Sequence, residues 1–233
     1  METNHSGQPR FIAPMLCTRA PVLPHRQSWF YEVKRDGHRA LAVKDRAKVT
    51  LYSPSGDKLD CPPAVDAVRK LNAVRAVIDC EVIALAQDGT GGHAPGSKPV
   101  ERAIRLYTFD LLHLNGRDLT REPIEYRKDR LCTLTLDTPL LFSPSLDCEP
   151  DMLVEQVAQL GLPGIIAKRR GSAYQPGKND GSWVTRRVKP SEPLRQVSSG
   201  HRLVSPRLRS RDGSAGLHPS TTGSLQSPGK RRA

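Results

Sequence analysis

The sequence is poor in aromatic residues and has no long apolar run. Only 5% of its 233 residues are aromatic, and the most apolar stretch, residues 76–86, is interrupted by Asp79 and Glu81. A membrane-spanning helix needs about 20 consecutive apolar residues, so this pattern excludes an α-helical membrane protein. The polar first residues also lack the apolar core of a signal peptide. We therefore expect a soluble protein that makes no membrane contact.

Cysteines are few and scattered. The chain has five, an odd number, and no two of them form a C-x-x-C pair; they are Cys17, Cys61, Cys80, Cys132 and Cys148. This pattern excludes the disulfide framework of a small secreted protein and the ligand spacing of a zinc site. It predicts a reduced, cytoplasmic compartment.

Acidic residues are outnumbered. There are 24 Asp and Glu against 36 Lys and Arg, a formal charge of +12. Such an excess indicates an anionic partner, for example a nucleotide or nucleic acid. After Lys189 eight basic and two acidic residues supply half of the excess, and no aromatic residue follows Trp183. We expect residues 1–27 to be an extended segment packed on a domain of residues 28–189, and residues 190–233 to be a disordered basic tail.

Hydrophobic periodicity predicts an α+β domain rather than a regular alternation of strands and helices. Expected strands cover residues 29–34, 39–44, 48–53, 77–85, 104–113, 165–168 and 183–188. Expected helices cover residues 63–71, 124–134 and 152–160, the last ending at Gly161. The first three strands alternate like a meander, with Asp36-Gly37 as the turn of a hairpin. Residues 87–98, rich in glycine and polar residues, are expected to form a loop.

The segment from Glu32 to Arg39 is the main candidate for chemistry. It reads Glu-Val-Lys-Arg-Asp-Gly-His-Arg, so that Lys34 stands between two carboxylates with an arginine just beyond. This arrangement suits a lysine that acts as a nucleophile toward phosphorus. The alternative is an exposed Asp-Gly hairpin without catalysis.

Two further residues interrupt or end apolar strands. Glu81 lies in an apolar run, where an unpaired buried carboxylate is costly; we expect it at a cleft, in an ion pair or bound to a ligand, or else facing water at a sheet edge. Lys168 ends an apolar strand beside two arginines and would suit triphosphate oxygens. The alternative for Lys168 is a solvated strand end.

Two candidates remain in the other strands. Phe109 could stack on a base or belong to the core. Arg187 shares a strand face with Thr185 and Lys189, and with Lys189 could face a phosphate.

Five motifs in order resemble the nucleotidyltransferase motifs of ATP-dependent DNA ligases, in particular the ligase domain of the bacterial end-joining type. They are Glu32–Arg39, Phe109–Leu119, the segment around Arg127, Gly164–Lys178 and Trp183–Arg187. The resemblance runs from about residue 14 to residue 188. It implies an ATP-grasp-like adenylation domain of antiparallel sheets with flanking helices.

The resemblance also implies an activity and roles for residues. Lys34 would take AMP from ATP, with Mg²⁺, and the AMP would pass to DNA so that a break is sealed in repair or recombination. Phe109 would stack on adenine, and Glu81 would hold the ribose or the metal. The other expected nucleotide-binding residues are Glu32, Arg39, Lys168 and Arg187. The implied partners are nicked or broken double-stranded DNA and end-joining proteins. The resemblance also implies a monomer in the bacterial cytoplasm, at the nucleoid.

The sequence departs from the family pattern at three motif positions. Pro163 replaces a glutamate associated with the metal, Thr185 replaces a lysine, and Pro54 replaces an arginine associated with DNA phosphates. The expected tail also leaves no room for the OB-fold domain that usually follows, which would fit a truncated or frame-shifted gene. These departures favour, as an alternative, a degenerate or truncated ligase-like module that binds nucleotide or DNA. A second alternative is an RNA-ligase or mRNA-capping type of nucleotidyltransferase.

Overall fold

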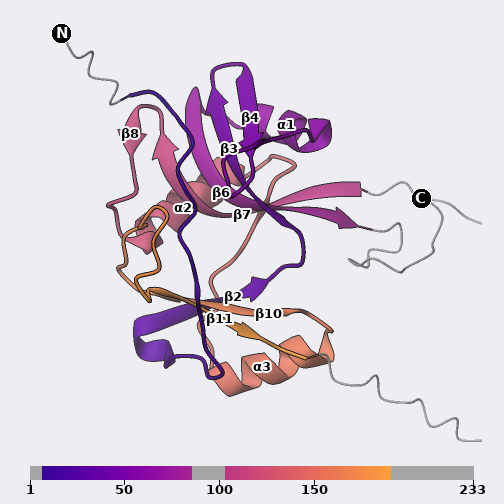
Figure 1. The fold of residues 1–233 in the computed structure, drawn as a ribbon, viewed down its shortest axis with the longest axis vertical. Coiled ribbons are helices and arrows are strands. Elements are labelled where there is room, and N and C mark those ends of the chain that lie inside the picture. The colour runs from indigo at the N-terminus through magenta and orange to yellow at the C-terminus, as the bar shows by residue number, and fades with distance from the viewer. Residues whose placement is uncertain (1–6, 86–102, 190–233) are drawn as a thin grey trace, which may run out of the picture. The chain divides into compact units, whose positions relative to one another are not determined.

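The computed structural model describes residues 7–85 and 103–189, which belong to one compact unit, Met1–Leu194. Strands within these ranges form two sheets (Figure 1). The smaller sheet has the order β1 (Thr18–Arg19), β11 (Trp183–Arg187), β10 (Gly164–Arg169) and β2 (Trp29–Lys34). The larger has the order β5 (Lys58–Leu59), β4 (Lys48–Tyr52), β3 (His38–Asp45), β6 (Arg75–Leu85), β7 (Ala103–Leu114) and β8 (Arg117–Asp118), with β9 (Leu141–Phe142) also paired to β7.

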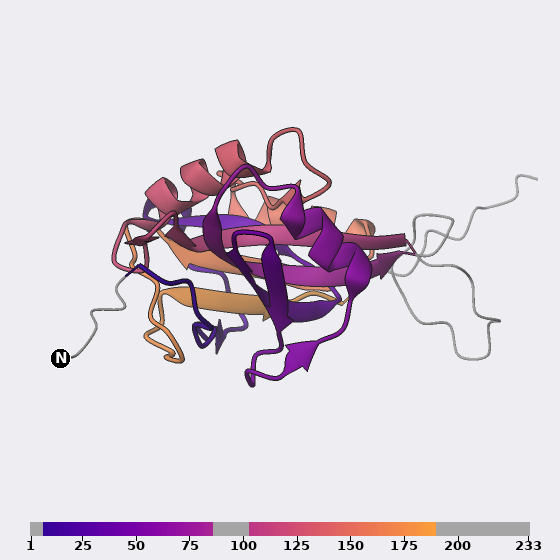
Figure 2. The same cartoon turned by 90° about the horizontal axis from the view of Figure 1, so that it is seen from above.

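Most strand pairs are antiparallel, as expected, but the sheets are mixed. β1 pairs with β11 in parallel, and β9 pairs with β7 in parallel. The long strands β6 and β7 run side by side (Figure 2), and their register shifts between Val77 and Ile78 and again between Asp79 and Cys80. Such irregularities re-aim side chains, and the second one lies beside a charged residue, Asp79.

Three α-helices and one 3₁₀ turn, η1 (Arg26–Ser28), complete the described elements. Helix α1 (Pro62–Arg69) packs on β4, β3 and β7, α2 (Ile124–Thr135) on β7 and β9, and α3 (Pro150–Gln159) on β10. Prolines begin α1 and α3, where the missing N–H costs nothing. The predicted end of the third helix is confirmed, because Gly161 follows it with φ +65°. None of these helices is long and apolar enough to cross a membrane.

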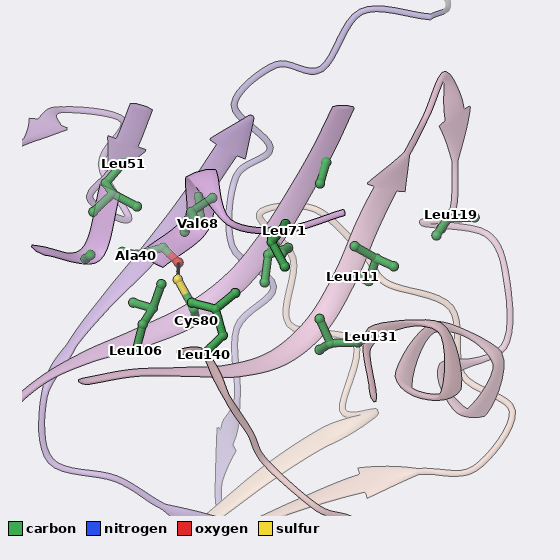
Figure 3. Packing of buried hydrophobic residues seen from close by; sticks show 14 residues of the cluster. Ala40, Leu51, Val68, Leu71, Cys80, Leu106, Leu111, Leu119, Leu131 and Leu140 are labelled. Atoms are coloured by element: carbon green, nitrogen blue, oxygen red, sulfur yellow. Dashed lines mark hydrogen bonds between the residues drawn. The ribbon is translucent and has the colours of Figure 1, made fainter. Parts of the chain in front are cut away.

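The main hydrophobic core lies between the larger sheet and helices α1 and α2 (Figure 3). Leu71 and Val68 come from the α1 region, Leu131 comes from α2, and the sheet contributes small side chains such as Ala40. Cys80 is fully buried here and its thiol donates to the Ala40 carbonyl oxygen at 3.1 Å. Cys80 is therefore part of the core.

The predicted hairpin between the first two strands is wrong. β2 pairs with β10 in the smaller sheet, whereas β3 pairs with β4 and β6 in the larger one. The segment around Gly37 thus carries the chain from one sheet to the other. Glycine is needed there because a Cβ would collide with the Val82 carbonyl oxygen and lie 3.0 Å from the Glu81 Cγ. Alternating apolar residues predict a strand but do not say which strand it pairs with.

Two predictions fall on other parts of the chain. The expected loop at residues 87–98 and the expected tail at 190–233 lie outside the described residues. The domain boundaries at 27, 28, 189 and 190 stay predictions.

Candidate active site

A cavity of about 350 Å³ takes side chains from both sheets. That volume is in the range of pockets that hold small molecules. The smaller sheet and the segment after β2 contribute most of the wall, and β3, β6 and β7 of the larger sheet contribute a further part. The segments before β1 and after β9 complete it. The lining residues are Leu16, Cys17, Glu32, Val33, Lys34, Arg35, Gly37, Arg39, Glu81, Tyr107, Phe109, Ser143, Ile166, Lys168, Trp183 and Thr185.

Six of the seven predicted site residues line this cavity; Arg187 is the exception. Lys34 is the last residue of β2 and is half-buried. Its Nζ donates to the carbonyl oxygen of Arg35 at 3.0 Å. Across the sheet it is paired with Gly164, whose lack of a side chain lets β11 approach, because a Cβ would collide with the Arg186 carbonyl oxygen. The end of strand β2 therefore places Lys34 at the cavity.

Glu32 is almost completely buried, with 3% of its surface exposed, and it holds two lysines. Its Oε1 lies 2.7 Å from the Lys128 Nζ and 2.8 Å from the Lys168 Nζ, and its Oε2 accepts from the Ser143 hydroxyl at 3.2 Å. Burial lowers the pKa of Lys128, while the Glu32 carboxylate opposes that shift. Glu32 and Lys168, predicted as separate nucleotide contacts, are ion-pair partners in this structure.

Arg39 and Asp79 form a two-point ion pair on neighbouring strands β3 and β6. The Arg39 Nε and NH2 groups donate to the two carboxylate oxygens at 3.0 and 2.7 Å. The Asp79 carboxylate beside it raises the pKa of Arg39 despite the cost of burial. Tyr174 donates its hydroxyl to the same carboxylate at 2.7 Å. The arginine is therefore a fixed positive charge on the cavity wall.

Aromatic rings form another part of the wall. Phe109 and Trp183 meet edge to face, with ring centroids 6.3 Å apart. The Lys168 Nζ lies 4.2 Å from the Trp183 ring centroid and 4.9 Å from that of Phe109. A cation held against aromatic faces in a half-enclosed space is attracted by the ring electrons. The cavity thus offers an apolar surface directly beside positive charge.

Glu81 reaches the cavity from β6. Its Oε1 accepts the Gly37 backbone N–H at 3.0 Å. Burial raises the pKa of Glu81, and Lys34 and the Gly37 N–H oppose the rise. Among the described residues no three His, Cys, Asp or Glu side chains cluster as a metal site. One carboxylate still fits Mg²⁺, which usually takes one or two carboxylates and completes its shell with water and phosphate oxygens.

Arg187 is placed next to the cavity rather than in it. It is exposed near the end of β11, on the same strand face as Thr185, and lines a shallower depression with Arg19 and Pro21. Thr185 itself lines the cavity, and its hydroxyl is buried without a hydrogen-bond partner among the described residues.

The other two departures lie outside the cavity lining. Pro163 uses its carbonyl oxygen to accept the Val188 N–H at 3.2 Å. Pro54 is exposed in the turn between β4 and β5.

Sequence reasoning missed several cavity residues. Tyr107, Ser143 and Arg35 line it, while Lys128 and Asp79 hold the charges that face it. Asp79 carried a signal, since it is charged within an apolar strand, but nothing in the sequence pairs it with Arg39. These contacts depend on long-range pairing between strands.

The fold and the site define a class of protein in which two sheets line a cavity of nucleotide size and a lysine belongs to its wall. The family model for the ATP dependent DNA ligase domain matches residues 14–185. The chain belongs to this family, and its fold is that of the family's adenylation domain.

Relatives of known sequence and structure agree. The multifunctional non-homologous end joining DNA repair protein LigD of Mycobacterium tuberculosis is 32% identical over 177 residues, which are 74% of this chain and 23% of that protein. The crystal structure of the ligase domain of M. tuberculosis LigD matches with a TM-score of 0.67 and 30% identity, over 76% of this chain and 59% of that one.

A mycobacterial DNA ligase D complexed with ATP and MES matches with a TM-score of 0.64 and 29% identity, over 75% of this chain and 59% of that one. The chain spans only about a quarter of the length of LigD.

Proposed function

We propose that this chain is the adenylation domain of an ATP-dependent DNA ligase, with Lys34 as the residue that carries AMP. The observation that carries the proposal is the position of Lys34 at a cavity with basic and aromatic walls. Family membership and the ATP complex of a mycobacterial relative support ATP as the substrate.

The first step is a transfer of AMP to lysine. The Lys34 Nζ gives a proton to the solvent, and its lone pair forms a bond to the α-phosphorus while the bond from that phosphorus to the pyrophosphate oxygen breaks. In the following steps a DNA 5′-phosphate displaces the lysine, and a 3′-hydroxyl then displaces AMP to close the break. The rigid end of β2 holds the nucleophile in place, which reduces the entropy cost of the attack.

The cavity residues divide into an apolar and a charged group. Phe109 and Trp183 offer ring faces or edges to the adenine. Glu32 acts near the base through its buried carboxylate and holds Lys168, which together with Arg39 supplies positive charge for phosphate oxygens. Arg187 would take part only at the edge, through ligand atoms that extend beyond Thr185. Glu81 would hold the ribose or Mg²⁺.

The metal assignment rests on the chemistry of one carboxylate. Bound Mg²⁺ would neutralise charge on the phosphates. Glu81 keeps its second oxygen for this role, since the Gly37 N–H occupies the first. Nicked or broken duplex DNA is the second substrate, with end-joining proteins as partners. We place the protein as a monomer in the bacterial cytoplasm, at the nucleoid.

Labelled ATP tests the proposal directly. The protein is incubated with Mg²⁺ and ATP labelled in the α-phosphate, and covalent label is measured after denaturation. The expected result is labelled protein, no label on Lys34→Ala, and normal labelling of Lys48→Ala, an exposed lysine on β4. Equal label on the wild type and Lys34→Ala would defeat the proposal.

A further inference from the structure

Arg35, the residue after the proposed nucleophile, has an unusual setting in the cavity. Its guanidinium carbon lies over the Tyr107 ring, 4.0 Å from the centroid, so the cationic group contacts an aromatic face. The residue is half-buried and lines the cavity. Its Nε is buried and has no hydrogen-bond partner among residues 7–85 and 103–189. The side chain thus contacts an aromatic ring, while its buried Nε has no acceptor in the described part of the chain.

The other cations of the cavity each have a carboxylate partner or a separate role. Arg39 is paired with Asp79 and Lys168 with Glu32, both at less than 3 Å. Lys34 is the proposed nucleophile. In the described part of the chain no carboxylate lies within ion-pair distance of Arg35. Among the described residues, Arg35 is therefore the cavity guanidinium that has no carboxylate partner.

We propose that Arg35 binds a phosphate group beside Lys34. The inference rests on the proposed function and adds a residue to it. A guanidinium offers parallel N–H groups that match two oxygens of one phosphate. Contact with the Tyr107 ring restrains the side chain before the ligand arrives, so less side-chain entropy is lost on binding. The phosphate comes either from the β- or γ-position of ATP or from the 5′ end of the DNA.

A purely structural role makes a different prediction. If Arg35 only fastens the segment after β2 to Tyr107, its replacement lowers thermal stability and weakens all ligands alike. A phosphate contact instead weakens only ligands that carry the relevant phosphate. Phosphate dependence therefore separates the two roles.

The experiment uses the full chain with Lys34→Ala as background, so that binding is measured without covalent reaction. Calorimetry gives affinities for adenosine, AMP, ATP and inorganic pyrophosphate. A second series measures nicked duplexes with a 5′-phosphate or a 5′-hydroxyl at the nick. Each series is run on Arg35→Met, Arg35→Lys and the control Arg121→Met, an exposed arginine outside the cavity lining. Thermal melting shows that each variant is folded.

Arg35→Met is expected to lose about ten- to a hundredfold in affinity for ATP and pyrophosphate, with adenosine unchanged. Arg35→Lys is expected to lose less, because the charge remains. Loss confined to the preference for the 5′-phosphorylated nick also supports the inference and assigns the phosphate to DNA. Folded Arg35→Met with undiminished ATP, pyrophosphate and 5′-phosphate binding overturns the inference alone. Failure of the background protein to bind any of these ligands overturns the proposed function as well.

Discussion

Two aspartates lie opposite each other on neighbouring strands, Asp79 on β6 and Asp110 on β7, and each is held by its own arginine. Arg127 donates its Nε and NH2 to Asp110 at 2.7 and 2.8 Å, and both side chains are fully buried. Its NH1 donates to the carbonyl oxygens of Glu122 and Ser172. All three nitrogens of this guanidinium donate to acceptors inside the protein.

The second pair repeats the geometry with a different outcome. Arg39 donates to Asp79 through the same two nitrogens, but 22% of its side chain is exposed and it lines the cavity. Within the described residues its NH1 group has no protein acceptor at hydrogen-bond distance. The comparison teaches that an arginine whose three nitrogens all donate within the protein holds the fold together, whereas an arginine with a spare nitrogen at a cavity is available to a ligand.

The largest expected effect comes from breaking the closed pair. Arg127→Met leaves the Asp110 carboxylate buried and uncompensated, which costs about 3–5 kcal/mol of unfolding free energy. Urea unfolding measures it, with Arg130→Met, an exposed arginine on the same helix, as control. A loss no larger than that of the control would show that Asp110 does not need its charge partner.

Arg39→Met is expected to lower the free energy of unfolding by about 1–3 kcal/mol, less than Arg127→Met, but to reduce activity more. Asp79 keeps the Tyr174 hydroxyl, and water in the cavity reaches the place of the lost guanidinium. Loss of a fixed charge facing the phosphates is expected to lower the rate of lysine adenylation by about a hundredfold. Adenylation kinetics and urea unfolding are measured on the same samples. Equal adenylation rates in Arg39→Met and the wild type would remove the distinction between the pairs.

Tyr174→Phe tests both ion pairs, because Tyr174 contacts Asp79 through its hydroxyl and Arg127 through its ring. The hydroxyl donates to Asp79 and accepts the Met15 N–H at 2.9 Å, while the Arg127 guanidinium lies 5.9 Å from the ring centroid. We expect a loss of about 1–2 kcal/mol. In double variants it should be coupled to Arg39→Met and additive with Arg127→Met, because only the hydroxyl is lost. Additivity with both would indicate that the hydroxyl does not support Asp79.

The smallest expected effect is a change in the pH dependence of stability that comes from one buried histidine. His113 lies on β7 with 5% of its surface exposed, and neither ring nitrogen has a hydrogen-bond partner among the described residues. Burial lowers its pKa, with Arg75 acting in the same direction and Asp118 against it. The unfolded histidine binds a proton near pH 6.5, whereas the folded one stays neutral there. The free energy of unfolding therefore has its full value above about pH 6.5 and decreases as the pH falls toward the pKa of the folded histidine.

The check is the free energy of unfolding between pH 7.5 and pH 5 for the wild type and His113→Leu, with pH points chosen on both sides of the ordinary histidine pKa of about 6.5. The variant is expected to show a shallower decline. Parallel curves would mean that His113 titrates alike in both states.

The sequence by itself determined the local features of this protein. Prolines and Gly161 set the limits of helices, apolar alternation located the long strands, and the spacing of charged residues marked Lys34 and its neighbours as site candidates. These signals depend on residues within a few positions of each other, so one chain is enough to read them.

Only the tertiary structure decided which strands pair and which charges meet. Glu32 and Lys128 are 96 positions apart, and Asp79 and Tyr174 are 95 apart. Whether Gly37 lies in a hairpin or between two sheets depends on β10 and β6, which come much later in the chain. The physical reason is that burial and pairing energies come from contacts between distant residues, and a local pattern is compatible with several such partners.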